Sequence, residues 1–72
     1  MQIESILGQR IKELRGALKL SQEALADKAE VDRTFINHVE NGRRNISIRS
    51  LERIVHALDV SFTQFFNDPR FN

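Results

Sequence analysis

Apolar residues recur along the chain at the spacing of an α-helix. Leu7, Ile11, Leu14 and Leu18 follow one another at intervals of four, three and four residues. This spacing places them on one face of a helix, so the sequence predicts an amphipathic first helix of about fifteen residues. Gly8 weakens the start of that helix, since glycine is a poor helix former.

A short capping pattern then repeats four times. In each copy an apolar residue precedes a Ser or Asp, and a second apolar residue follows four positions after that polar residue. This is the form of a helix N-cap flanked by a hydrophobic staple, and it predicts helices that begin near residues 22, 33, 48 and 62. Asn41-Gly42 supplies a left-handed stop for the second of these. The four copies are Leu20-Ser21…Leu25, Val31-Asp32…Ile36, Ile46-Ser47…Leu51 and Val60-Ser61…Phe65.

The predicted fold is therefore all-α, with five short helices and no strand signal. A turn of about three residues joins the second and third helices, which is the spacing of a helix-turn-helix at about residues 21–42. We expect residues 1–72 to form one domain, near the lower size limit for a chain that folds alone.

The third helix has an unusual outer face. On a helical wheel Ile36 and Val39 fall on the inner side, and Arg33 lies at the N-terminal edge. The outer side carries hydrogen-bonding residues that are mediocre helix formers but can read the edges of DNA bases. These residues are Thr34, Asn37, His38 and Asn41.

Positive charge is concentrated in the same stretch. The whole chain carries a net charge of +1, yet residues 33–53 contain five arginines and two glutamates. On charge alone, a solvated basic face is a simpler explanation of that excess than nucleic-acid binding. Arg33 and Arg49, however, fall in the first turns of helices, where the helix dipole disfavours a cation. A DNA phosphate would resolve both conflicts; for Arg33 the alternative is an ion pair with Asp32 or Glu30.

Composition excludes several other functions. The chain has no cysteine and only two histidines, His38 and His56, so we expect no disulfide, metal or cofactor. No phosphate-binding glycine loop or clustered catalytic set is present, which argues against an enzyme. No apolar run approaches the length of a membrane span, and the N-terminus lacks the layout of a secretory signal. We therefore expect a cytoplasmic protein.

The segment SQEALADKAEVDRTFINHVENGRRN resembles the helix-turn-helix core of the lambda-repressor/Cro-like (XRE) family. Similarity continues through ISIRSLERIVHALDVS and covers roughly residues 7–66. Within the family, DRTFINHVENGRRNIS looks most like the controller proteins of restriction–modification systems. The resemblance implies a compact five-helix fold and a DNA-binding transcription regulator, and it also implies a partly buried ion pair between Arg15 and Glu40. The positions that it matches to DNA contacts are Gln22, Arg33, Thr34, Asn37, His38, Arg43, Arg44 and Asn45.

Two residues of the third helix have open interpretations. His38 could contact a base or a phosphate, or it could be a solvated histidine beside the DNA. Phe35 is expected to be half-buried, with contact to a thymine methyl as the alternative.

The C-terminal end of the chain is rich in phenylalanine. Four of the five phenylalanines lie in the last eleven residues, more than so small a core can easily bury. Family members dimerise through their last two helices, so we expect a homodimer formed by residues 47–72 on a roughly palindromic DNA site. The alternative is that these side chains only close the core. The predicted interface residues are Ile48, Leu51, Val55, Phe62, Phe65 and Phe66.

Other partners and functions are also considered. Glu23, Asp27 and Glu30 form an acidic face that in this family can touch RNA polymerase, although an ordinary solvated helix face is the simpler explanation. An antitoxin or protein-binding adaptor could use the same fold, and a phage-type repressor is a further alternative.

Overall fold

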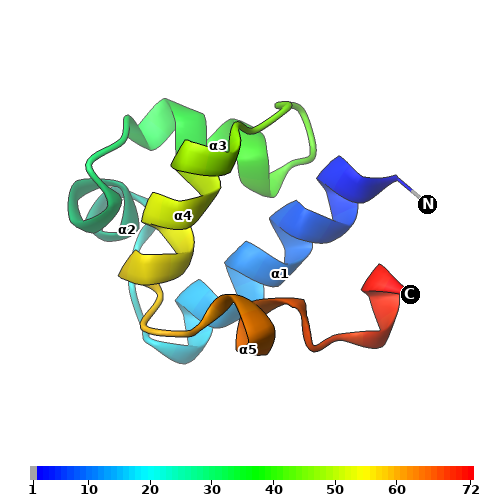
Figure 1. Ribbon diagram of the computed structural model, residues 1–72. Coiled ribbons are helices and arrows are strands. Elements are labelled where there is room, and N and C mark those ends of the chain that lie inside the picture. The colour runs from blue at the N-terminus through cyan, green and yellow to red at the C-terminus, as the bar shows by residue number, and fades with distance from the viewer. Residues whose placement is uncertain (1) are drawn as a thin grey trace.

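The computed structural model describes residues 2–72 of the chain, and these residues contain no strand. The all-α prediction with five helices is therefore confirmed. In chain order the elements are α1 (Ile3–Ala17), α2 (Gln22–Ala29), α3 (Arg33–Glu40), α4 (Ile48–Ala57) and α5 (Phe62–Phe66), followed by the 3-10 turn η1 (Pro69–Phe71) (Figure 1). No helix within residues 2–72 is long and apolar enough to cross a membrane.

All four predicted N-caps are present. The side chains of Ser21, Asp32 and Ser47 accept a hydrogen bond from a backbone N–H in the first turn of α2, α3 and α4. Ser61 forms a full capping box with Gln64 at the start of α5. These caps satisfy backbone donors that the helix itself leaves unpaired, and α2 to α5 begin at the predicted residues.

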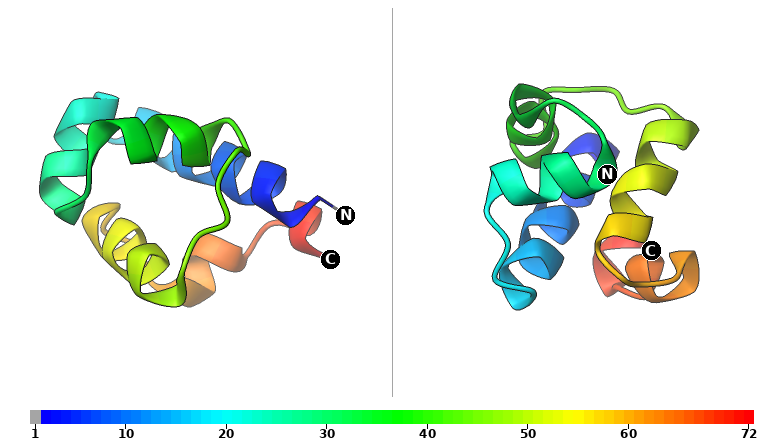
Figure 2. Two further views of the ribbon diagram at one scale, coloured as in Figure 1. Left: turned by 90° about the horizontal axis from the view of Figure 1, so that it is seen from above. Right: turned by 90° about the vertical axis from the view of Figure 1, so that its left-hand side faces the viewer.

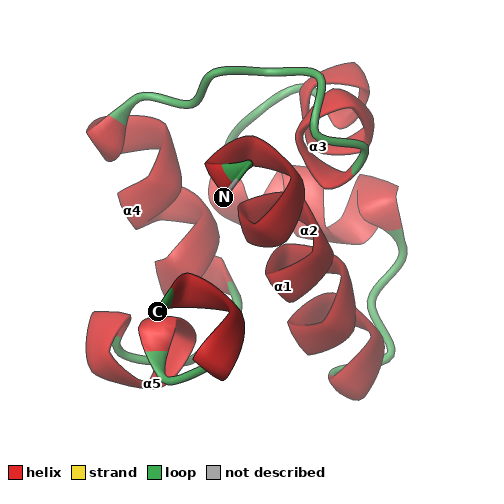
Figure 3. Ribbon diagram, turned by 90° about the vertical axis from the view of Figure 1, so that its right-hand side faces the viewer, coloured by secondary structure: helices red, strands yellow, loops and turns green. Residues whose placement is uncertain are grey.

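The predicted stop after α3 is also confirmed. Gly42 adopts the left-handed conformation at φ 71°, and its N–H donates to the carbonyl oxygen of Val39 at 3.0 Å. The N–H of Arg43 donates to the carbonyl oxygen of His38 at 2.9 Å, which completes a Schellman motif. The loop 41–47 then crosses from α3 to α4 over the start of α1 (Figure 3).

The helices pack around one apolar cluster. α1 packs against α3, while α2 packs against both α3 and α4, so that the helix-turn-helix lies across α1 on one side of the molecule (Figure 2). The staple residues Leu20, Val31, Ile46 and Val60 pack against the edge of this cluster. Its buried members are Leu7, Ile11, Leu25, Ala26, Ala29, Ile36, Val39, Ile54, Val55, Ala57, Leu58 and Phe65.

Gly8 has a packing role that its helix propensity does not reveal. A Cβ atom at this position would collide with the carbonyl oxygen of Val39 and lie 2.8 Å from that of Glu40. The missing side chain therefore allows α1 to approach the last turn of α3 closely.

An ion-pair network fastens the C-terminal segment to α1. Arg10 donates from Nε to the carbonyl oxygen of Phe65 at 2.8 Å. Arg70 of η1 donates to both oxygens of Glu13, at 2.8 and 2.5 Å, and to Asp68. The Arg70 guanidinium lowers the pKa of Glu13 and holds that of Asp68 far below its usual range, mainly through these hydrogen bonds. η1 consequently lies against α1 (Figure 1).

Candidate nucleic-acid interface

The outer face of α3 carries most of the predicted base-reading side chains. Arg33, Thr34 and Asn37 are exposed, and they line a shared depression with Gln22 of α2. These four residues form the reading face. His38, on the same helix, is half-buried. The structure thus brings together side chains from both helices of the helix-turn-helix at one polar surface.

Three further arginines lie beyond the C-terminal end of α3. Arg43 and Arg44 are exposed in the loop 41–47 together with Asn45, and Arg49 is exposed in the first turn of α4. The guanidinium carbon of Arg44 lies 5.2 Å from the centre of the Phe35 ring. This cation–π contact holds the charge near α3, and the half-burial predicted for Phe35 is confirmed. No short-range sequence signal indicates the contact between Phe35 and Arg44.

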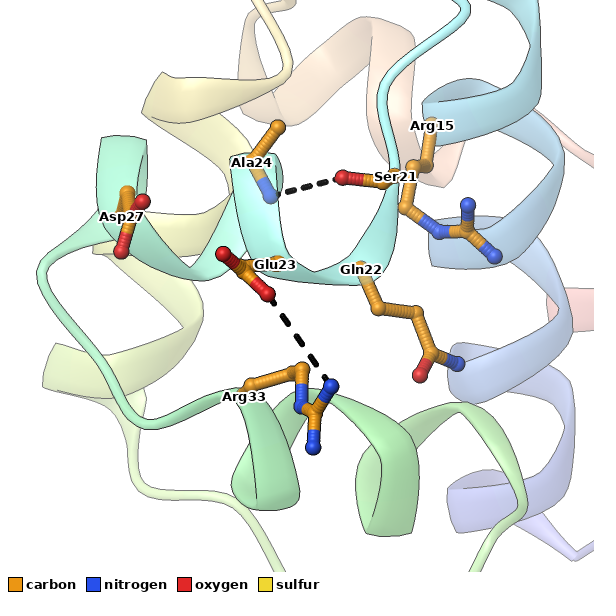
Figure 4. A pocket seen from close by; sticks show the side chains of 7 residues that line it. All are labelled: Arg15, Ser21, Gln22, Glu23, Ala24, Asp27 and Arg33. Atoms are coloured by element: carbon orange, nitrogen blue, oxygen red, sulfur yellow. Dashed lines mark hydrogen bonds and ion pairs between the residues drawn. The ribbon is translucent and has the colours of Figure 1, made fainter.

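Arg33 makes only a weak internal contact. Its Nη1 atom lies 4.0 Å from Glu23 of α2, and both side chains are about two-thirds exposed, at 67% and 71% (Figure 4). The alternative partners Asp32 and Glu30 are not the ones that Arg33 approaches. An exposed pair of this length contributes about 0–1 kcal/mol, and Arg33 still lies at the positive end of the α3 dipole. The side chain is therefore available to an external anion.

The Arg15–Glu40 ion pair is present and connects α1 to the end of α3. Arg15 donates from Nε and Nη2 to the two carboxylate oxygens of Glu40, at 2.6 and 3.0 Å. The Glu40 side chain is only 2% exposed, and hydrogen bonding to it raises the pKa of Arg15. Arg15 also donates to the carbonyl oxygen of Leu20 at 2.8 Å. One guanidinium thus joins α1, the turn before α2 and the end of α3.

Gln22 belongs to the same network. Its Nε2 atom donates to Glu40 at 3.0 Å, and its Oε1 atom accepts from Nδ2 of Asn37 at 3.3 Å. Figure 4 shows the Gln22 side chain extending from α2 toward α3 beside Arg15. The sequence identified Gln22 and Asn37 separately but gave no sign that their amides are bonded.

The predicted self-association surface needs a correction at two positions. Ile48, Phe62 and Phe66 are exposed at 82%, 43% and 38%, and Leu51 is half-buried. Val55 and Phe65 are instead 2% and 0% exposed. Both belong to the core of the chain because their sides of α4 and α5 turn inward. Their side chains have almost no surface left for a partner.

Ile3 is an exposed residue that the sequence analysis missed. It is 44% exposed and lines an apolar groove of about 240 Å³ together with Ile46, Leu51 and Phe66. Because Ile3 lies at the opposite end of the sequence, only the folded arrangement brings it to this surface. We define the apolar face as the exposed or half-exposed residues Ile3, Ile48, Leu51, Phe62 and Phe66.

Comparison with known proteins agrees with this geometry. A helix-turn-helix family model matches residues 11–65. Control protein C.MunI of a Mycoplasma species is 39% identical over 62 residues, which cover 85% of this chain and 84% of that protein. Control protein C.BamHI of Bacillus amyloliquefaciens is 37% identical over 59 residues, which cover 81% of this chain and 73% of that protein.

Solved structures with the same fold lead to the same group. The restriction–modification controller protein C.AhdI from Aeromonas hydrophila has a TM-score of 0.86 at 38% identity, covering 92% of this chain and 100% of that chain. The controller C.Esp1396I bound to a 25 base pair operator site has a TM-score of 0.83 at 41% identity, covering 88% and 83%. The chain therefore belongs to the lambda-repressor/Cro-like (XRE) helix-turn-helix family, within its group of restriction–modification controller proteins.

Proposed function

We propose that the chain is a sequence-specific DNA-binding transcription regulator that places α3 in the major groove. The observation that carries this proposal is the reading face, in which exposed Arg33, Thr34 and Asn37 of α3 lie beside Gln22 of α2, whose amide is bonded to Glu40 and Asn37. An α-helix fits the major groove, where each base pair presents a distinct pattern of donors and acceptors. In this proposal Arg33, Thr34, Asn37 and His38 face bases and adjacent phosphates.

Affinity comes from the arginines at the edge of the reading face. Arg43, Arg44 and Arg49 lie beyond α3, where they and Asn45 can follow a phosphate backbone. Phe35 holds the guanidinium of Arg44 in place, so less side-chain freedom is lost when a phosphate binds.

The proposed regulator binds as a homodimer through the apolar face. Exposed Ile48, Phe62 and Phe66 would be covered by a second copy, and two copies would place two α3 helices about 34 Å apart on a roughly palindromic site. Self-association is then assigned to residues 47–72, with a contribution from Ile3, and the helix-turn-helix to residues 21–42. One solved structure similar to this chain is a tetramer of the controller C.Esp1396I in complex with its natural 35 base pair operator.

The regulated system is proposed by similarity. Relatives named as controllers of restriction–modification systems favour a role in controlling a nuclease and its methylase. Such a regulator works in the cytoplasm, where bacterial DNA lies. If it activates transcription, the exposed acids Glu23, Asp27 and Glu30 of the α2 surface are the proposed contact with RNA polymerase. An inverted repeat upstream of its own gene, beside nuclease and methylase genes, would support this role.

Binding of duplex DNA by the double variant Arg33→Ala/Arg44→Ala tests the proposal. We expect affinity for the operator to fall by at least tenfold, because two charged contacts are lost. The control is Lys19→Gly, which removes one positive charge from the segment between α1 and α2, across the molecule from α3 (Figure 1). Lys19 has φ 58°, a conformation that glycine adopts without strain.

The same experiment separates the regulator from an antitoxin or protein-binding adaptor. An adaptor would use the apolar face against another protein and would not need the arginines. Operator binding by the double variant that equals the parent chain and Lys19→Gly would therefore contradict the DNA-reading function. A phage-type repressor would give the same binding result, and the genes beside its operator would distinguish it.

A further inference from the structure

A chain of hydrogen bonds connects the buried ion pair to the reading face. Arg15 holds both carboxylate oxygens of Glu40, Glu40 accepts from Gln22 at 3.0 Å, and Gln22 accepts from Asn37 at 3.3 Å. Glu40 is almost fully buried, Gln22 is half-buried and Asn37 is exposed. The network therefore runs from the interior of the molecule to the surface proposed to meet DNA.

Elementary chemistry fixes the direction of every bond in this chain. An ionised carboxylate paired with a guanidinium can only accept hydrogen bonds. Gln22 must therefore present its amide nitrogen to Glu40, so its carbonyl oxygen points the other way. That oxygen also only accepts, and Asn37 must donate one of its two N–H groups to it. The buried ion pair thus determines which way the amide of an exposed residue faces.

Two groups of the Asn37 side-chain amide remain free to bind DNA, and they determine which base edge the residue fits. One N–H and the carbonyl oxygen of its side chain are not used by Gln22. In the major groove adenine offers an acceptor at N7 and a donor at N6, which match this pair. Guanine offers two acceptors, at N7 and O6, and would place one of them against the Asn37 oxygen.

We propose that Asn37 reads an adenine in each operator half-site, and that Gln22 is a positioning residue that fixes the Asn37 amide for that contact. The inference rests on the proposed DNA-binding function and adds to it the base that is read. It also gives Gln22 a role other than the DNA contact that the family resemblance implies, because both ends of its amide are engaged within the protein.

The test begins with an operator selected by the parent chain from a pool of randomised DNA duplexes. Each A·T pair of that operator is then replaced by G·C, and each adenine in turn by 7-deazaadenine, which lacks the N7 acceptor. The parent is expected to lose about 5- to 150-fold in affinity at one adenine per half-site, the cost of a lost bidentate contact. Asn37→Ala is expected to show the same loss on the unmodified operator and no further loss at that adenine.

The positioning role of Gln22 needs a variant of similar size that forms no amide hydrogen bonds. Gln22→Met is expected to weaken discrimination at the same adenine while the other base pairs are read as before. In the Asn37→Ala background it should change discrimination no further. The matched control is Gln9→Met on α1, whose amide oxygen accepts from Arg70 at 3.3 Å and which should read all base pairs as the parent does.

Three results would overturn the proposal. The first is an Asn37→Ala variant that loses affinity by the same factor on every substituted duplex. The second is a Gln22→Met variant in which the slope of log binding constant against log salt concentration is smaller in magnitude by about 0.9. That result would identify Gln22 as a phosphate ligand. The third is a Gln22→Met variant that melts well below the parent and loses all contacts evenly, which would reduce the network to a structural role.

Failure of the adenine assignment is distinguishable from failure of the proposed function. A parent chain that enriches no duplex from the pool contradicts DNA reading as a whole, and the adenine contact with it. A parent chain that enriches an operator which Asn37→Ala still reads at every position contradicts the adenine assignment alone.

Discussion

The reading face and the apolar face differ in the interactions that hold their side chains. The reading face is polar and is supported by directional bonds, from Glu40 through Gln22 to Asn37. The apolar face consists of Ile, Leu and Phe side chains, of which Leu51 packs against the core cluster and Phe66 packs edge-on against Phe65 and Phe71. Directional bonds suit discrimination between similar ligands, whereas apolar area suits association with little directional preference.

Both surfaces depend on α1, but on different residues. Arg15 connects α1 to α3 through Glu40, while Arg10 and Glu13 connect α1 to α5 and η1. Because these contacts use separate side chains, changes on one side should leave the other surface intact. DNA reading and self-association are therefore expected to be separable by mutation.

The largest effect on stability is expected at the buried Arg15–Glu40 ion pair, to which the reading face is bonded. Glu40→Ala leaves Arg15 partly buried without its carboxylate, which should lower the free energy of unfolding by about 3–5 kcal/mol. Urea unfolding of the variant and the parent measures this difference. The control is Glu23→Ala, whose exposed contact with Arg33 should contribute no more than about 1 kcal/mol. Equal losses of unfolding free energy in the two variants would mean that the buried pair contributes no more to stability than the exposed one.

The next effect is expected on the apolar face. Ile48 is 82% exposed at the first position of α4, so Ile48→Asp should leave the monomer folded. If a second copy covers Ile48, its loss should cost about 1.5–3 kcal/mol of association, or more than tenfold in the dimer dissociation constant. Sedimentation measures this change. A parent chain that is already a monomer at tens of micromolar, with and without DNA, would contradict the dimer.

Two glycines of α1 should respond in opposite directions to the same change. Gly8→Ala forces a methyl group against the α3 carbonyls and should destabilise the chain by about 1–3 kcal/mol. A Cβ at Gly16 would meet nothing within 4 Å, so Gly16→Ala should stabilise it by up to about 1 kcal/mol through helix propensity. Thermal unfolding of both variants checks the difference. Equal shifts would show that α1 and α3 do not approach closely at Gly8.

The smallest effect on stability is expected in the ion-pair network that fastens the C-terminal segment to α1. The carboxyl pKa values of Glu13 and Asp68 are lowered by Arg70 from ordinary values of 4.5 and 3.8. Groups with lowered pKa values stabilise the folded state above those ordinary values and lose that contribution as pH falls through the folded ones. The stability difference between the parent and Arg70→Ala should therefore be present at pH 6 and shrink below about pH 4.5.

Melting curves from pH 6 to pH 2 measure that difference. Arg70→Lys is the matched variant, because it keeps the charge but lacks the planar fork that bonds several carboxylate oxygens at once. It should fall between the parent and Arg70→Ala. A difference that stays constant with pH would show that Arg70 acts through packing and not through the two carboxylates.

The helices could be predicted from the sequence because their start signals are local. Each cap at Ser21, Asp32, Ser47 and Ser61 bonds within its own first turn, so a window of a few residues contains all the information. The Arg15–Glu40 pair was within reach only through the family resemblance, since 25 residues separate its members.

The remaining features depend on contacts between distant segments. Arg70 and Glu13 are 57 residues apart, and no local pattern indicates that they meet. Phe65 and Phe66 are adjacent and identical in hydrophobicity, yet Phe65 is buried in the core cluster and Phe66 is exposed. Gly8 likewise looks only like a poor helix former in the sequence, because its close contact with the backbone of α3 exists only in the folded chain.

The salt dependence of duplex binding tests the central claim most directly. The logarithm of the observed binding constant of the parent chain should fall with the logarithm of salt concentration, with a slope of about −0.9 for each phosphate neutralised. Arg33→Ala/Arg44→Ala should reduce the magnitude of that slope by up to about two such steps, while Ile48→Asp should keep the slope per bound copy. A slope near zero for the parent, or the same slope for the parent and the double arginine variant, would contradict the assignment of α3 and its arginines to DNA.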